Sequence, residues 1–82
     1  MNENIALMKV RRMELVEQQS SLRMKAKILC RTISPLINPA LVDVEKMHVA
    51  EAANTMDELV VTQAELLQVA SKIADLEEAL GN

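Results

Sequence analysis

The sequence predicts an all-α fold: an antiparallel hairpin of two long helices that self-associates into a four-helix bundle. Three observations predict it. The only two prolines, Pro35 and Pro39, separate two long stretches that contain no helix breaker until Gly81. Apolar residues recur every seven positions in both stretches, as in helices that pack side by side. Half of the 82 residues are apolar and none is aromatic, so the core must consist of aliphatic side chains.

The first helix is predicted over residues 3–33. Its seam column, called d, contains apolar residues at an unbroken spacing of seven: Met8, Leu15, Leu22 and Leu29. The column four residues further on is apolar at its ends and polar in the middle, where Arg12 and Gln19 lie. Pro35 disfavours helical geometry at Ser34, so the first helix should end just before it.

The turn is predicted over residues 34–38 and the second helix over residues 39–80, within one domain that spans residues 1–82. Asn38 matches an N-cap, and Pro39 matches the first helical position, where a missing N–H costs nothing. Gly81 lies where a C-terminal cap is expected. The second helix is therefore expected to be the longer one and to extend past its partner.

The seam of the second helix is predicted from a similar repeat. Its d column includes Leu59, Leu66 and Ile73, and the column four residues after d is Val49, Met56, Gln63, Ala70 and Glu77. With a bend centred near residue 37, antiparallel neighbours have numbers that sum to about 73 to 75. This register predicts that Arg12 lies beside Gln63.

Charge divides the chain at the turn. Residues 1–34 contain seven basic and three acidic residues, a balance of +4, whereas residues 35–82 contain two basic and nine acidic residues, a balance of −7. The antiparallel hairpin brings the basic helix against the acidic one, which favours this orientation. No apolar run approaches the roughly 20 residues that span a bilayer, and charged residues interrupt the stretch of residues 1–16, so we expect no secretory signal. We expect a cytoplasmic protein without a membrane role.

More apolar residues are present than the seam of one hairpin can cover. The residues that overflow it, and that we predict to form the self-association interface, are Leu7, Val10, Met13, Val16, Val60, Leu67, Val69 and Leu76. A second copy of the hairpin is the preferred partner, which makes a homodimer, and an unidentified protein is the alternative. The predicted function is that of a non-enzymatic protein-protein interaction or regulatory module, a coiled-coil-like bundle.

We expect no catalytic or cofactor-binding site in this chain. The nearest metal-like pattern, Glu45-x-x-His48-x-x-Glu51, requires carboxylates from a facing helix at the same level, where Lys25 and Lys27 are predicted instead. Cys30 is the only cysteine and is interpreted as a small buried apolar residue. We therefore predict no enzyme activity, no metal site and no cofactor.

Two further functions are alternatives. The first is a nucleic-acid-binding regulator that uses the basic residues of the first helix: Arg11, Arg12, Arg23, Lys25, Lys27 and Arg31. A dimer of two-helix chains is similar in architecture to the small RNA-binding repressors of primer found on plasmids. The second is a subunit of a filament or secretion apparatus, because two helices hinged at Asn38-Pro39 resemble type III secretion needle subunits in length and plan.

Overall fold

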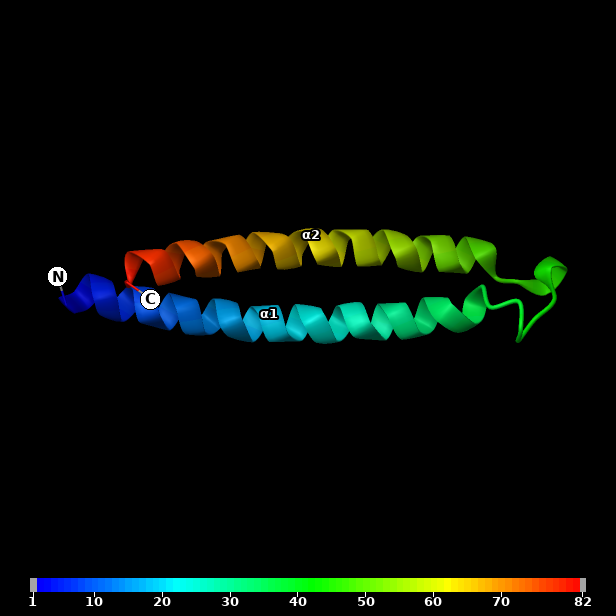
Figure 1. Cartoon of the computed structure of the whole chain (residues 1–82), viewed down its shortest axis with the longest axis horizontal. Helices are drawn as coiled ribbons and strands as arrows, with labels where there is room; N and C mark the ends of the chain where they lie inside the picture. The colour runs from blue at the N-terminus through cyan, green and yellow to red at the C-terminus, as the bar shows by residue number, and fades with distance from the viewer. Residues whose placement is uncertain (1, 82) are drawn as a thin grey trace.

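The computed structural model describes residues 2–81 and shows two long antiparallel helices packed against each other (Figure 1). Helix α1 spans Asn2–Leu36 and helix α2 spans Val49–Ala79, and a short 3₁₀ helix, η1, lies between them at Val44–Lys46. The hairpin is 63 Å long and only 16 Å by 14 Å across. The predicted all-α class and helical hairpin are therefore confirmed.

The connection between the helices is longer than predicted. Helix α1 continues to Leu36 with Pro35 in its last turn, and α2 begins at Val49 rather than at residue 39. The Asn38 side chain does cap a turn, since its Oδ1 accepts a hydrogen bond from the Ala40 N–H at 2.9 Å. That turn ends before Asp43, which is extended. Capping starts a helix, but a helix persists in a protein where one face is packed, and residues 37–48 contain no buried side chain.

The long connection changes the register of the two helices. Arg12 pairs with Glu77, not with the predicted Gln63, so facing residues have numbers that sum to about 89. Each residue added to the turn shifts the pairing partner along α2 toward its C-terminus. As a result α1, rather than α2, extends beyond its partner at the open end of the hairpin (Figure 1).

The core is a single narrow seam. On α1 its buried residues are Leu15, Leu22, Leu29 and Ile33, and on α2 they are Ala52, Thr62, Val69 and Ile73. The predicted seam residues Met8, Leu59 and Leu66 are half-buried. Leu66 packs against the central cluster of Leu15, Leu22, Val69 and Ile73.

The second seam column of α2 differs from the prediction. It lies three residues after each d position, at Thr55, Thr62, Val69 and Leu76, whereas Val49, Met56, Gln63 and Ala70 are exposed. The threonines fit because each hydroxyl donates to the carbonyl oxygen four residues earlier: Thr55 to Glu51 at 2.9 Å and Thr62 to Glu58 at 2.8 Å. These bonds satisfy the hydroxyl group, so a threonine can occupy a buried position that its polarity alone would argue against.

Candidate functional site

The hairpin exposes far more surface than a folded monomer of its size. Its accessible surface is 6329 Å², whereas folded monomers of this mass expose about 4,900 Å². Its radius of gyration is 18.5 Å, against roughly 12 Å for a compact chain of this length. The surface in excess, roughly 1,400 Å² per chain, is in the range that each chain of a stable dimer buries.

Much of the exposed surface is apolar. The large apolar side chains that the structure leaves exposed are Ile5, Leu7, Val10, Met13, Val16, Met24, Ile28, Ile37, Leu41, Val44, Val49, Met56, Val60, Val61 and Leu67. Scattered apolar residues are normal on protein surfaces, but a contiguous group marks an interaction site. The position of each residue around its helix therefore decides which of them form one surface.

One broad side of the hairpin carries such a group, which we call the apolar face. Helical spacing places on it two neighbouring columns of α2 and the adjoining edge of α1: Ala53, Met56, Val60, Gln63, Leu67 and Ala70 from α2, and Val16, Arg23, Ala26 and Cys30 from α1. A groove of about 350 Å³ runs along it between the helices. The groove is lined by Ala26, Cys30, Met56, Leu59, Val60, Gln63 and Leu66. Cys30 is exposed there, so the expectation that it is buried is wrong.

The opposite broad side, the charged face, has a different composition. In the columns that border the seam on this side, α1 presents Arg11 and Lys25, and α2 presents Glu58, Glu65 and Lys72. All five residues are exposed. Burial of this side against an apolar surface would strip water from several charges, whereas the columns that α2 contributes to the apolar face contain no charged residue between Ala53 and Ala70.

The predicted self-association residues do not all lie on the apolar face. Val16, Val60 and Leu67 do, and Met13 lies at its margin in the same column of α1 as Lys27, whereas Leu7 and Val10 are exposed on outward positions of α1. The prediction that Val69 and Leu76 belong to the self-association interface is wrong. Val69, only 4% exposed, belongs to the hairpin core, and half-buried Leu76 packs against that core. Val69 continues the seven-residue repeat of Thr55 and Thr62, and this repeat is the sequence signal for its place in the seam.

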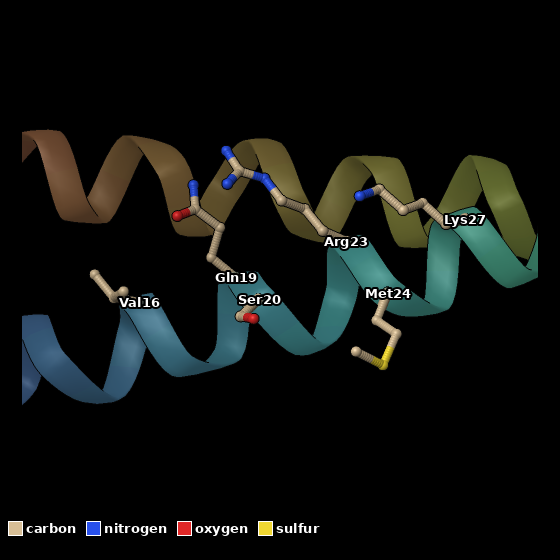
Figure 2. A pocket seen from close by; sticks show the side chains of 6 residues that line it. All are labelled: Val16, Gln19, Ser20, Arg23, Met24 and Lys27. Carbon is tan, nitrogen blue, oxygen red and sulfur yellow. The ribbon is translucent and has the colours of Figure 1, made fainter.

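The basic residues of α1 are dispersed around the helix. Figure 2 shows Arg23 and Lys27 beside Gln19 on the edge of α1 that faces α2, whereas Met24 points away from that edge. By helical spacing, Arg11 and Lys25 lie on the charged face and Arg31 on the outward side of α1. Arg12 already binds Glu77, with 2.6 Å between Nη2 and Oε1. The six predicted nucleic-acid contacts therefore do not share one surface.

The residues that could hold a metal remain apart. Within residues 2–81 no group of three His, Cys, Asp or Glu side chains is arranged to hold an ion. His48 Nδ1 lies 4.0 Å from Glu51 Oε2, with both side chains largely exposed. The structure thus offers the Glu45, His48 and Glu51 pattern no further ligand.

Neither α1 nor α2, within the described range, contains a stretch that is both long and apolar enough to cross a membrane. The chain was also compared with known protein families, with curated proteins and with solved structures. None of these comparisons found a match.

Proposed function

We propose that the protein is a non-enzymatic protein-protein interaction module of the cytoplasm, and that its working form is a homodimeric four-helix bundle. One observation carries the proposal: the contiguous apolar face on a hairpin whose exposed surface exceeds that of a compact monomer by roughly 1,400 Å² per chain. Four-helix bundles bury apolar residues on two sides of each helix, one against each neighbour. In the hairpin only one of these two sides is covered.

A second copy suits the apolar face because each chain has the same need to cover it. A two-fold axis places identical patches against each other, so a single surface can satisfy both chains. Small domains with a limited core commonly gain stability by such association. The core of this hairpin, which contains seven buried apolar residues within the described range, is limited in this sense.

Two adjacent valines of α2 provide a matched test. Val60 lies on the apolar face and Val61 on the outward side, yet their exposed fractions are similar, 60% and 57%. We would measure the solution mass by light scattering on a sizing column over a range of concentrations. The wild-type protein and Val61→Lys should have the mass of two chains, and Val60→Lys the mass of one, because a buried unpaired ammonium group is costly.

Three results would overturn the proposal: a wild-type monomer at every concentration, equal effects of the two substitutions, or dissociation caused only by Val61→Lys. Circular dichroism of each variant shows whether the helices are retained, which separates loss of the dimer from loss of the fold. Nucleic-acid binding and a filament or secretion role stay predictions, and no contact in the structure favours either one.

A further inference from the structure

We propose that the two hairpins dock through their apolar faces with both turns at the same end of the bundle, so that α1 of each chain lies against α2 of the other. This inference rests on the homodimer proposed above and specifies its geometry. Two-fold symmetry allows two face-to-face arrangements. If the axis runs along the bundle, the turns lie together and α1 faces the partner's α2. If the axis crosses the bundle, the turns lie at opposite ends and each helix faces its own copy.

The distribution of apolar residues along the hairpin favours the first arrangement. The groove lined by Cys30, Met56 and Val60 lies in the half of the apolar face nearer the turn. The other half of the same face, nearer the chain termini, contains Gln19 and the Arg12–Glu77 ion pair. With the turns together, apolar half meets apolar half and the polar halves lie together.

With the turns at opposite ends, the apolar groove of each chain would instead cover the polar half of its partner. Met56 and Val60 would then approach the level of Gln19 and the ion pair, and charged groups would lose water without gaining an additional partner. In the same-end arrangement these polar groups lie instead against the polar groups of the partner, where hydrogen bonds can replace the lost water.

Charge favours the same arrangement independently. Residues 1–34 have a balance of +4 and residues 35–82 a balance of −7. When each helix faces its own copy, cations face cations and carboxylates face carboxylates, and such like-charge contacts oppose docking. When α1 faces the partner's α2, each helix has only neighbours of opposite charge.

Specific side chains are available for this pairing. Lys27 lies at the margin of the apolar face, and no described carboxylate lies within 4 Å of it. Asp57 is exposed at the outward margin of α2 and is likewise without a cation within 4 Å. In the same-end arrangement the level of Lys27 is about five residues, roughly 7.5 Å, from that of the partner's Asp57. The long lysine side chain can span most of this offset.

The test is a spin-label distance measurement on the full chain with Cys30→Ala as background. A label at Ala40→Cys reports the turn, and a label at Ser21→Cys, near the middle of the hairpin on an exposed position, serves as the control. In both arrangements the two middle labels are separated only by the width of the bundle, below about 40 Å. The turn labels should also be below about 40 Å apart if the turns lie together, and near the hairpin length of 63 Å if they do not.

A short distance at both positions supports the same-end dimer. A short distance at Ser21→Cys with a long one at Ala40→Cys overturns the proposed orientation and leaves the dimer intact. No dipolar coupling at either position, together with the mass of one chain, overturns the dimer itself. To guard against an effect of the background substitution, the solution mass of Cys30→Ala is first compared with that of the wild-type protein.

Discussion

Arg12 of α1 and Glu77 of α2, 65 residues apart in sequence, join the two helices near the open end of the hairpin. Both the Nε and the Nη2 groups of Arg12 donate to Glu77 Oε1, at 3.0 and 2.6 Å. In the described part of the chain this is the one side-chain hydrogen-bonding contact between α1 and α2. The pair therefore marks the register that the apolar seam sets.

We expect this ion pair to contribute little to the free energy of unfolding. Both side chains are more than a third exposed, so water and salt screen their attraction. A double-mutant cycle with Arg12→Ala and Glu77→Ala should give a coupling energy of about 0–1 kcal/mol that falls as salt is added. Urea denaturation of the four proteins measures it. A coupling well above this range that salt does not reduce would contradict the screened, half-exposed geometry.

The seam of α1 should account for much more of the stability. Leu22 is 9% exposed and belongs to the central core cluster. Leu22→Ala should lower the free energy of unfolding by about 2–5 kcal/mol, because it removes buried methyl groups and leaves a cavity.

Met24, 64% exposed on the outward side of α1, provides the control in the same helix. Met24→Ala should change stability by no more than about 0.5 kcal/mol. Urea midpoints of the two variants and the parent test both expectations. Equal losses from Leu22→Ala and Met24→Ala would mean that the seam is not where the structure places it.

Thr62 is a buried position at which a polar group can be removed without leaving an unpaired partner. It is 1% exposed, and its hydroxyl donates only to the Glu58 carbonyl, an oxygen that helix geometry also pairs with the Thr62 backbone N–H. Thr62→Val keeps the shape of the side chain and replaces the hydroxyl with a methyl group. We expect the free energy of unfolding to rise by about 0.5–1 kcal/mol.

The comparison for Thr62→Val is Thr55→Val, which makes the same change at a half-buried seam position and should have a smaller effect. Thermal melting at one fixed protein concentration measures both. A clear loss of stability in Thr62→Val alone would show that the hydroxyl group serves a purpose that the single hairpin does not reveal.

The extent to which the fold could be predicted differs between the helices. On α1 the seven-residue repeat of Leu15, Leu22 and Leu29 is unbroken, and the structure buries all three residues. On α2 two columns next to d could complete the seam: the one that contains Met56 and the one that contains Thr62. The structure uses the column of Thr62, whose hydroxyl is satisfied by a hydrogen bond within the helix.

The turn was beyond prediction for a related reason. Asn38 and Pro39 carry the local signals of a helix start, and the structure uses them for one turn. Whether a helix continues depends on packing against a distant segment, which local chemistry does not encode. The length of the turn determines which residues of α1 and α2 face each other. The sequence does not reveal that length, so the pairing of Arg12 with Glu77, and with it the side of α2 that forms the apolar face, is known only from the structure.

Coupling between folding and dimer formation should make thermal stability depend on protein concentration. If the apolar face is covered only in the dimer, unfolding separates two chains, and each tenfold increase in concentration stabilises the dimer by about 1.4 kcal/mol. For two chains of 82 residues this corresponds to a rise in melting temperature of roughly 3–6 °C per tenfold. Circular dichroism melts over a hundredfold range measure it. Val61→Lys should retain this dependence, and Val60→Lys should melt at a lower temperature that does not change with concentration. A wild-type melting temperature that stays constant over the same range would show that the hairpin folds alone, with its apolar face in water.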